Sequence, residues 1–444
     1  MASAYLTRTP SSAGSQQKHT WSFWIKRLGL STSGNGIFQY YVNSNNSFEI
    51  RFGSSDNLLV RNLDGGSYTW RIDTNRRFKD LNAWYHIVVA LDSTQSTNTD
   101  RIKIYVNGVQ ETSFSSSTYP SQNANVKWGG TGYNYEIGRT TIASNETLNG
   151  QLAHVHYANN ITYTSSTFGE TDTTTGIWKP KTSPTVTYGT NGFFLKMDNS
   201  GNIGLDSSGQ SNSFTTNGTI IQTKDTPSNV YAVLNSMQRL SSQSLTNVNS
   251  TFTNSSGGHR ATNSTLAANT GKWYAEVKVI AQDGSATYPQ IGIINPDKFA
   301  YNMYLGASDK GYGYLSNGNK QYNNSATSFG STYTVGDIIG IAMDLTNNKI
   351  YFSKNGTWQD SGNPASGATG TGSAYDLATG VFYSFAQSSF DGSQNPVYSW
   401  NFGNGYFGTT AITSAGSNGN GSLFEYDVPT GYYALNTKNL GTQS

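Results

Sequence analysis

The sequence predicts an all-β protein, and its length suggests two to three domains. Its 444 residues include 48 glycines and only 10 prolines, and aromatic residues reach 13% while charged residues make up only 12%. Many short runs alternate apolar and polar side chains with a period of two, which is the spacing of a half-buried strand. Polar stretches of Ser, Thr, Asn and Gly separate these runs, as turns do. The composition argues against coiled coils and helical bundles, and the aromatic content argues against disorder.

Cysteine content, charge and hydropathy exclude further classes of protein. The chain has no cysteine, which excludes disulfide scaffolds, thiolate metal sites and cysteine nucleophiles. The net charge is only +2, from 28 Lys and Arg against 26 Asp and Glu, and no basic block stands out, so no nucleic-acid partner is expected. The polar first 14 residues show no signal peptide, and the longest apolar runs, 87–91 and 338–343, are too short for membrane insertion.

The first half of the chain contains five runs that we interpret as strands. Residues 84–91 are apolar on both faces, as is typical of a central strand in a sandwich. Residues 101–106 alternate and end in Asn107-Gly108, the strongest short signal for a hairpin, because both turn positions favour a positive φ. The predicted strands are residues 21–26, 48–52, 67–72, 84–91 and 101–106.

The second half of the chain repeats this plan. In each half an apolar strand ends at an aspartate, Asp92 or Asp344, and a short polar stretch leads to Lys-Ile-Tyr and then to Asn-Gly. We interpret the repetition as one architecture used twice, with chance similarity between two hairpins as the alternative. The predicted strands of this half are residues 273–280, 338–343 and 349–353, followed by the turn Asn355-Gly356.

The boundary between the two halves is expected within residues 199–229. This stretch is rich in Gly, Ser, Asn and Thr and contains few large apolar residues, as a connector does. The predicted domains are residues 1–222, which include the connector, and residues 223–444, which include a C-terminal segment.

Short motifs in the two halves resemble two related β-sandwich families. The first set resembles the laminin-G-like, concanavalin-type jelly roll and the second resembles the SPRY domain, which implies two tandem concanavalin-like β-sandwiches. Laminin-G-like domains usually carry an acidic pair where this sequence has Ala153 and His154, so no function of those acids carries over. The first resemblance lies in residues 21–27, 82–89, 104–108 and 148–153, and the second in residues 271–276, 336–340 and 350–356.

The segments between these motifs resemble a family of bacteriophage structural proteins, common in marine phages and often described as tail-fibre or virion-associated. This resemblance covers nearly the whole chain. It implies a protein that is made in the host cytoplasm, is assembled into the virion, and has other virion proteins as partners. It also implies a homo-oligomer, which would be a trimer in a fibre. The segments are residues 5–13, 168–172, 178–181, 188–192, 206–209, 225–229 and 429–439.

Catalysis must be weighed, because glycoside hydrolases also use jelly rolls. Hydrolysis requires two carboxylates that face each other across a sugar. Glu170 and Asp172 have a suitable spacing but lie in a turn-rich polar segment. Glu49, Glu276 and Glu425 each stand alone, and we expect them to face solvent or to pair with Lys or Arg. The sequence therefore predicts no catalytic residues, with polysaccharide depolymerase as a minor alternative.

Four residues are candidate metal ligands, although no cofactor is required. His154 and His156 would point to one face of a strand, a geometry that suits a metal, and two exposed polar residues are the alternative. Calcium is the candidate cofactor, because laminin-G-like domains often bind it at a sandwich rim. Asp92 and Asp100 flank a polar stretch and could converge there, and turn formation by aspartate is the alternative.

Recognition through aromatic residues remains as the predicted activity. Tyr offers a large and stiff contact area at low entropy cost, and neighbouring Asn and Ser add adaptable hydrogen bonds. One stretch of the second half combines these residue types and is expected to form exposed loops, with packing between the sheets as the alternative. The candidate ligand-binding residues are Tyr301, Asn302, Tyr304, Tyr312, Tyr314 and Tyr322.

These observations predict a non-enzymatic virion structural protein. We expect a tail-fibre or adhesion component that binds a host surface glycan or protein through loops of its sandwiches. The alternative is a capsid decoration, head-fibre or tail protein whose partners are other virion proteins.

Overall fold

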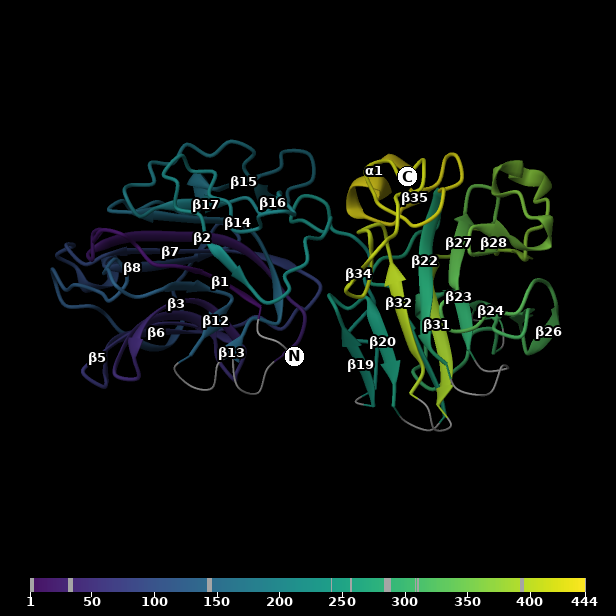
Figure 1. The fold of residues 1–444 in the computed structure, drawn as a ribbon, viewed down its shortest axis with the longest axis horizontal. Coiled ribbons are helices and arrows are strands. Elements are labelled where there is room, and N and C mark those ends of the chain that lie inside the picture. The colour runs from purple at the N-terminus through teal and green to yellow at the C-terminus, as the bar shows by residue number, and fades with distance from the viewer. Residues whose placement is uncertain are drawn as a thin grey trace. The chain divides into compact units, whose positions relative to one another are not determined.

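The computed structural model describes residues 4–30, 35–141, 146–240, 242–255, 258–282, 289–307, 309, 311–391 and 395–443. The chain folds as two compact units, residues 1–222 and 223–444. Each unit is a sandwich of two large β-sheets with loops at its rims (Figure 1), which confirms the all-β prediction. Within the described residues, no helix combines the length and the apolar character needed to cross a membrane.

The larger sheet of the first unit is antiparallel and eight-stranded. Period-two alternation builds it: in β4, Phe48, Ile50 and Phe52 enter the core, while Glu49 and Arg51 lie on the opposite face. Its strands, in spatial order, are β10 (Phe114–Thr118), β6 (Ser67–Arg77), β5 (Asn57–Asp64), β4 (Asn46–Phe52), β3 (Asn35–Asn43), β11 (Tyr135–Ile137), β1 (Tyr5–Arg8) and β18 (Thr215–Asn217).

The second sheet of this unit is antiparallel and six-stranded. Its central strand β2 pairs with β14 and β7, so that Trp21 lies opposite Tyr157 on one side and Val89 on the other. The strands, in spatial order, are β17 (Phe193–Leu195), β14 (Gly150–Asn159), β2 (Lys18–Arg27), β7 (Trp84–Asp92), β8 (Ile102–Val106) and β9 (Val109–Glu111). The remaining elements are β12 (Arg139–Thr140) with β13 (Glu146–Thr147), β15 (Gly169–Thr171) with β16 (Trp178–Pro180), and the 3-10 turns Asn98–Asp100 and Ser165–Thr167.

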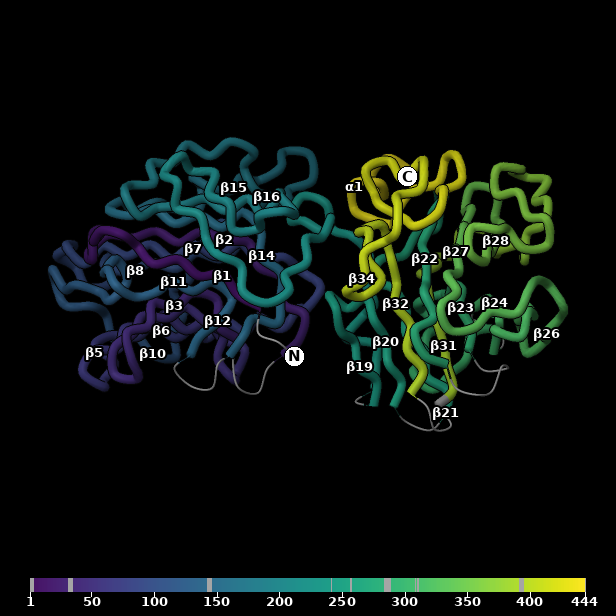
Figure 2. The backbone as a smooth tube through the Cα atoms, in the orientation of Figure 1, coloured from purple at the N-terminus to yellow at the C-terminus, as the bar shows by residue number. Residues whose placement is uncertain are grey.

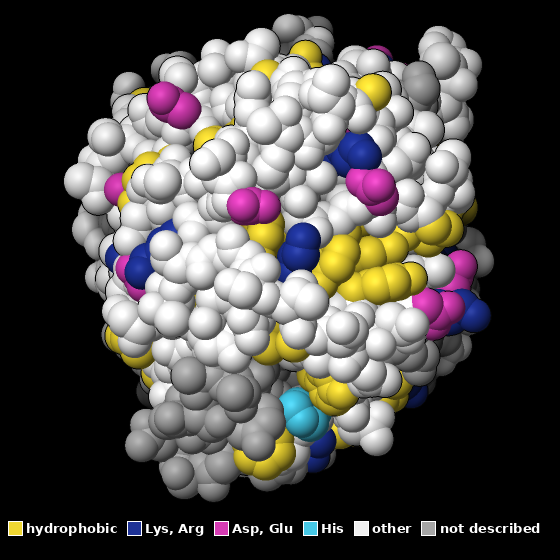
Figure 3. All heavy atoms as spheres, turned by 90° about the vertical axis from the view of Figure 1, so that its right-hand side faces the viewer, with side chains coloured by type: hydrophobic (Ala, Val, Ile, Leu, Met, Phe, Trp, Pro, Cys, Tyr) yellow, Lys and Arg dark blue, Asp and Glu magenta, His cyan; other side chains and the backbone are white. Residues whose placement is uncertain are grey.

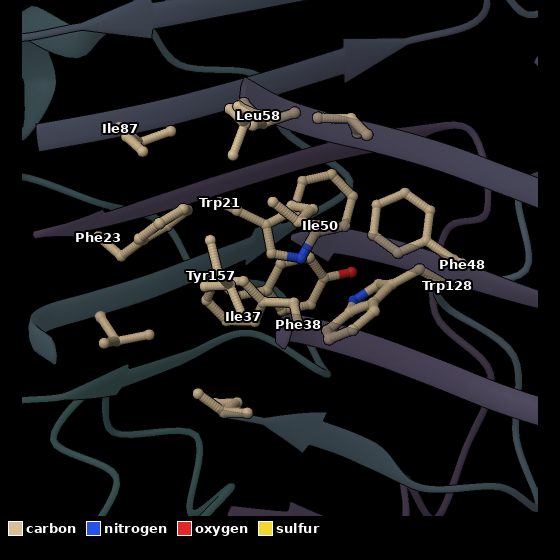
Figure 4. Close-up of a cluster of buried hydrophobic side chains, with 14 of the residues drawn as sticks. Trp21, Phe23, Ile37, Phe38, Phe48, Ile50, Leu58, Ile87, Trp128 and Tyr157 are labelled. Atoms are coloured by element: carbon tan, nitrogen blue, oxygen red, sulfur yellow. The ribbon is translucent and has the colours of Figure 1, made fainter. Parts of the chain in front are cut away.

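Aromatic side chains from both sheets fill the core of the first unit. Figure 4 shows Trp21 of the six-stranded sheet facing Phe48 of the eight-stranded sheet, and their rings stack at 4.8 Å between centroids. Trp128, from a rim loop, meets Trp21 edge-on at 5.6 Å. Such pairs contribute about 0.5–1.5 kcal/mol each beyond the burial of their area. This rigid core holds the rim loops in place.

The second unit is built in the same way from a nine-stranded and a six-stranded sheet (Figure 2). The main path of the larger sheet is β19 (Gln243–Thr246), β20 (Thr251–Asn254), β32 (Val397–Asn401), β22 (Lys272–Ala281), β27 (Ile338–Asp344), β28 (Lys349–Lys354) and β29 (Thr357–Trp358), with β30 (Tyr375–Asp376) on β28 and β35 (Tyr433–Ala434) on β22. The smaller sheet runs β21 (Gly258–Asn263), β31 (Ser384–Asp391), β23 (Gln290–Ile294), β24 (Gly311–Leu315), β25 (Asn319–Tyr322) and β26 (Ser325–Ser328). The other elements are β33 (Tyr406–Phe407) with β34 (Thr410–Ala411), the 3-10 turns Pro296–Lys298, Gln359–Ser361 and Pro364–Thr369, and the helix α1 (Thr437–Gln443).

The predicted strands and the burial of their tryptophans are confirmed in both units. Trp84, on β7, is 8% exposed and Trp273, on β22, is fully buried. The turns after β8 and β28 have positive φ at both positions, 49° and 87° at Asn107 and Gly108, and 48° and 80° at Asn355 and Gly356. Both predicted hairpins therefore form, each at the turn type that Asn-Gly favours.

The two hairpins also use their asparagines alike. The Oδ1 of Asn107 accepts the main-chain N–H of His86 at 2.8 Å, and the Oδ1 of Asn355 accepts that of Ile338 at 2.8 Å. In both units the asparagine therefore fastens the turn to the start of the preceding central strand. This shared detail favours one architecture used twice over a chance likeness of two hairpins.

Candidate functional site

A polar groove of about 700 Å³ opens at one rim of the first unit. It lies where the chain enters β2 and leaves β14, and a loop that precedes β17 closes its third side. The lining residues are 13–17, 125, 159–161, 187, 189 and 190.

The floor of the groove is a hydrogen-bonded stack centred on Asn159, the buried last residue of β14. Its Nδ2 donates to the carbonyl of Ser15 at 3.1 Å and to the hydroxyl of Tyr157 at 3.0 Å, and its Oδ1 accepts the N–H of Ser15 at 3.1 Å. Below it, the Tyr157 hydroxyl lies 2.9 Å from Nδ1 of His19. Burial lowers the pKa of His19 to about 3, so its ring is neutral at physiological pH. The floor is thus fixed and uncharged.

Two glycines leave room for this floor. A Cβ atom on Gly14 would overlap the side chain of Asn159, and one on Gly189 would overlap the Asn159 carbonyl oxygen. Gly189 also has a φ of +69°, which side chains rarely adopt. Both positions therefore require glycine, and their main chain lines the groove directly.

The walls of the groove present amides and hydroxyls. Gln16 is anchored by its Nε2, which donates to the carbonyl of Val126 at 3.1 Å. Asn125, Asn160 and Thr190 are exposed along the opening. None of the lining residues ionises, so the groove is suited to neutral polar groups and offers no acid–base chemistry of its own.

Sequence reasoning did not identify this groove. Its signal would have been the polar pairs Gln16-Gln17 and Asn159-Asn160, which stand directly beside two apolar strands. In a chain so rich in Asn, Ser and Gln, such pairs are not distinctive.

The predicted calcium ligands Asp92 and Asp100 each have other partners within the protein. Asp92 is buried, and its carboxylate accepts from the N–H and hydroxyl of Thr94 at 3.0 and 2.6 Å and from Nε2 of Gln95 at 2.8 Å. Asp100 is exposed and pairs with Nζ of Lys103 at 2.9 Å. The turn-forming alternative is therefore correct for Asp92.

Asp92 has a counterpart in the second unit. Lys18 lies opposite Asp92 across β2 and β7, with Nζ and Oδ2 3.5 Å apart. Lys272 lies opposite Asp344 across β22 and β27, at 3.0 Å. In both units this aspartate therefore ends a central strand and pairs with the neighbouring strand.

The predicted histidine pair is interrupted by a bulge. The register of β14 shifts between Ala153 and His156, and His154 has a φ of 48°. His156 is buried, with Nδ1 2.8 Å from the Tyr188 hydroxyl and its ring stacked on Phe194 at 3.9 Å. The described part of the chain contains no group of three His, Cys, Asp or Glu side chains placed to hold a metal. His156 therefore packs inside the protein, and the alternative of two exposed polar residues is wrong for it.

The tyrosine-rich stretch is divided between surface and core. Tyr312 and Tyr314 lie on β24 and are 5% and 0% exposed, so the expectation that they form exposed loops is wrong. The half-buried Tyr322 of β25 stacks on Tyr312 at 4.5 Å. Tyr312 and Tyr314 are buried because alternation along β24 turns both side chains toward the other sheet. The alternative, packing between the sheets, is therefore correct for these two residues.

Residues 299–304 remain at the surface. Tyr301 is 41% exposed and Asn302 is exposed, while the half-buried Tyr304 donates to Oδ1 of Asn324 at 2.6 Å and packs on His259 at 4.8 Å. Figure 3 shows the side of this unit that carries β26, where apolar side chains gather in separate patches on a largely uncharged surface. Of the predicted contact residues, the structure keeps these three together.

The carboxylates considered for catalysis have other partners. Lys179 lies 2.8 Å from Asp172 and 3.9 Å from Glu170, and Glu49 lies 3.4 Å from Arg51. For Glu276 the prediction of solvent or a basic partner is wrong: it is fully buried, and its carboxylate accepts main-chain N–H groups.

Comparison with known families agrees with the two sandwiches. A family model described as the concanavalin A-like lectin/glucanases superfamily matches residues 2–161, and the SPRY domain model matches residues 272–390. The similar solved structures include the SPRY domain of human HERC1, at 15% identity and a TM-score of 0.28, covering 34% of this chain and 87% of that chain. A heptameric SAP-like pentraxin from Limulus polyphemus is similar at 14% identity and a TM-score of 0.26, covering 35% and 70%.

Similar curated proteins share only a short segment with this chain. A Ran-binding proteins 9/10 homolog of Drosophila melanogaster is 30% identical over 93 residues, which are 20% of this chain and 10% of that protein. Ran-binding protein 9 of Danio rerio is 35% identical over 99 residues, 22% of this chain and 16% of that protein. The chain thus spans only a small part of the curated relatives that it matches. The family matches and the observed sheets together show that this chain carries a concanavalin A-like domain followed by a SPRY domain.

Proposed function

We propose that this chain is a non-catalytic adhesion protein of a bacteriophage particle, and that its concanavalin-like domain holds a neutral glycan of the host surface in the rim groove. The observation that carries the proposal is the chemistry of the groove, whose lining residues are all without an ionisable side chain. Amides, hydroxyls and main-chain groups exchange hydrogen bonds with sugar hydroxyls, and they avoid the desolvation cost of a buried charge.

The particle context rests on the resemblance of the joining segments to phage structural proteins. A groove of this kind is open and polar, so the affinity of one site is expected to be weak. Several copies on one particle would strengthen attachment by avidity, roughly 10²–10⁴-fold. A homo-oligomer, a trimer in the case of a fibre, would supply such copies.

The absence of catalysis in this proposal is supported by the positions of the carboxylates that were considered for hydrolysis. Glycoside hydrolysis uses two of them across a sugar, about 5–10 Å apart. Glu49 and Asp172 lie in ion pairs, and Glu276 is enclosed by the protein. Each of these groups has a structural partner and none lines the rim groove.

A structural role in the virion is the second candidate function. The observation that favours it is the aromatic surface at residues 299–304, where Tyr301 is 41% exposed beside Phe299, at 5.8 Å between ring centroids. Exposed aromatic rings are enriched in protein interfaces. Another virion protein would be the partner of this surface.

A pair of threonine variants tests the glycan proposal. Thr190 lines the groove, whereas Thr112 is also exposed but lies outside it. Thr190→Trp is expected to fill the groove and to weaken binding of the purified protein to neutral host-surface glycans at least about tenfold. Thr112→Trp is expected to bind as the wild type does, and both variants should keep the wild-type melting temperature.

The outcomes separate the two functions. Equal binding by both threonine variants, or no binding by the wild type, would contradict adhesion through the groove. In that case antibody labelling of intact particles tests the structural role. Many copies spread over the capsid would support a decoration protein, and a few copies at the tail would not.

A further inference from the structure

A second hollow, of about 400 Å³, lies on the outer face of the eight-stranded sheet, away from the rim groove. Strands β4, β5 and β6 form its base, and the turn at residues 53–55 forms one side. We call it the arginine basin, because Arg51, Arg61 and Arg77 line it.

Strand register assembles the basin from residues that are far apart in sequence. Glu49 of β4 pairs with Arg61 of β5, and Arg61 pairs with Arg71 of β6. Since alternate residues of β4 enter the core, the charged residues between them are left on the outer face. The result is a row of charged side chains across three neighbouring strands.

Acidic side chains hold the arginines in place. Arg61 binds Asp73 through Nε at 3.1 Å and Nη2 at 2.9 Å, and Arg71 pairs with the same carboxylate. Arg51 lies 2.6 Å from Glu146 and 3.4 Å from Glu49. The side chains of Arg51 and Arg61 are only 14% and 11% exposed, so their ion pairs and their burial fix their conformations.

Positive charge is nevertheless in excess in the arginine basin. Among the described residues, three guanidinium groups, those of Arg51, Arg61 and Arg77, line the basin, against one lining carboxylate, that of Asp73. Outside the lining, Glu49 and Glu146 lie near Arg51, and Arg71 pairs with Asp73. Burial also raises the pKa of Glu49. Arg77 is exposed at the edge of the basin, and its Nη1 donates to the carbonyl of Ser55. An incoming anion would therefore meet an unbalanced cation at that edge.

We propose that the arginine basin binds an acidic saccharide, a sugar that carries a carboxylate, at a site distinct from the neutral rim groove. The guanidinium of Arg77 would receive the carboxylate, because planar guanidinium groups match carboxylates in charge and shape. Ser54, Asn57, Asn75 and Ser115 line the same hollow and match the sugar hydroxyls. The apolar side chain of Leu59 completes the lining.

The test compares acidic and neutral sugars on the full chain. The probes are trimers of galacturonate, glucuronate and mannuronate, the neutral trimers of the corresponding hexoses, and sodium sulfate. Isothermal titration is expected to show that at least one uronate trimer binds at least about tenfold more tightly than its neutral counterpart. Raising the salt concentration should weaken that binding, because the charged groups at the edge of the basin are solvent-accessible.

Two neighbouring arginines provide the matched variants. Arg77→Gln removes the cation at the edge of the arginine basin and should weaken uronate binding at least about tenfold. Arg76→Gln removes an equal charge one residue away, where Arg76 pairs with Glu111 outside the basin, and should leave binding unchanged. Asn75→Asp, a nearly isosteric change at an exposed lining position, adds a negative charge and should also weaken binding.

Three results would overturn the proposal. The first is that uronate trimers bind no more tightly than neutral trimers, and the second is that Arg76→Gln and Arg77→Gln lose equal uronate affinity. The third is that sulfate competes with uronate as well as another uronate does, which would indicate a simple anion site. Because Thr190→Trp changes only the rim groove, its effect on neutral glycans distinguishes failure of this proposal from failure of the proposed adhesion.

Discussion

Glu276 is a fully buried carboxylate whose described partners are all neutral donors. Its oxygens accept the N–H groups of Glu425 at 2.8 Å and Tyr426 at 2.9 Å, the hydroxyl of Tyr274 at 3.1 Å and the Nδ2 of Asn401 at 3.3 Å. It therefore joins strand β22 to a segment about 150 residues later in the chain. Despite these donors, burial raises the pKa of Glu276 to about 7.

At pH 4.5, replacing Glu276 by Gln should destabilise the SPRY domain by about 1–3 kcal/mol, because the amide nitrogen accepts no hydrogen bond and would leave one of the main-chain donors unsatisfied. The change is measured by urea unfolding. Glu425→Gln, at a half-exposed position, is the matched control and should cost less than about 0.5 kcal/mol.

The same variant carries a pH signature. The ordinary pKa of the carboxyl is 4.5 and the folded value is about 7, so the folded state binds more protons between these values. Stability due to Glu276 is therefore full below pH 4.5 and is lost as the pH rises through 7. The stability of the wild type relative to Glu276→Gln should fall by about 3 kcal/mol between pH 4.5 and 8, so that at pH 8 the variant is at least as stable as the wild type. An advantage that grows with pH would contradict this account.

At the scale of elements, the outer face of the six-stranded sheet in the first unit is covered by an aromatic and histidine layer. The indole N–H of Trp178, on β16, donates to Nδ1 of His86, on β7, at 3.0 Å. Since indole is only a donor, Nδ1 carries no proton, and Nε2 donates to Oγ of Ser22 at 2.9 Å. Trp24 of β2 stacks on the same imidazole at 4.8 Å. Two strands and a covering hairpin thus depend on a neutral His86.

Mild acid should therefore weaken the concanavalin-like domain. Burial lowers the pKa of His86 to about 3 from an ordinary 6.5, so the unfolded chain takes up the proton first as the pH falls. Stability that is complete above pH 6.5 should decline by about 2 kcal/mol for this residue at pH 5. His86→Leu should flatten that decline in thermal melts, whereas His259→Gln, in the other domain, should not. An unchanged slope in His86→Leu would refute the assignment.

The sequence could predict elements whose local pattern and tertiary packing agree. The strand at residues 84–91 and the Asn-Gly turns are of this kind. The pattern was misleading at β24, where Gly-Tyr-Gly-Tyr has the composition of a recognition loop. There Gly311 is required by close packing, since a Cβ atom on it would overlap the carbonyl oxygen of Ile293 on the neighbouring strand β23. Likewise, strict alternation placed His154 and His156 on one face, and a bulge, which has no local signal here, changed the spacing.

At the scale of the whole molecule, the sites were the least predictable feature. The rim groove joins residues 13–17, 159–161, 187, 189 and 190. The pairing of β2 with β14, in which His19 lies opposite Asn159, brings the first two segments together, and a hydrogen bond from the Asn159 N–H to the Tyr188 carbonyl adds the third. The arginine basin likewise depends on the register of three strands. The order of the two domains could be predicted because the motifs are short stretches of sequence. The rim groove and the arginine basin could not, because each is formed by segments that only the folded sheets bring together.

The central claim is that the concanavalin-like domain binds a neutral glycan in its rim groove. Hydrogen–deuterium exchange of the full chain, with and without the neutral surface polysaccharide of the host, tests it most directly. We predict added protection in residues 13–17, 159–161 and 187–190, and none of it in Thr190→Trp. Protection that appears only at residues 299–304, or nowhere, would contradict the account.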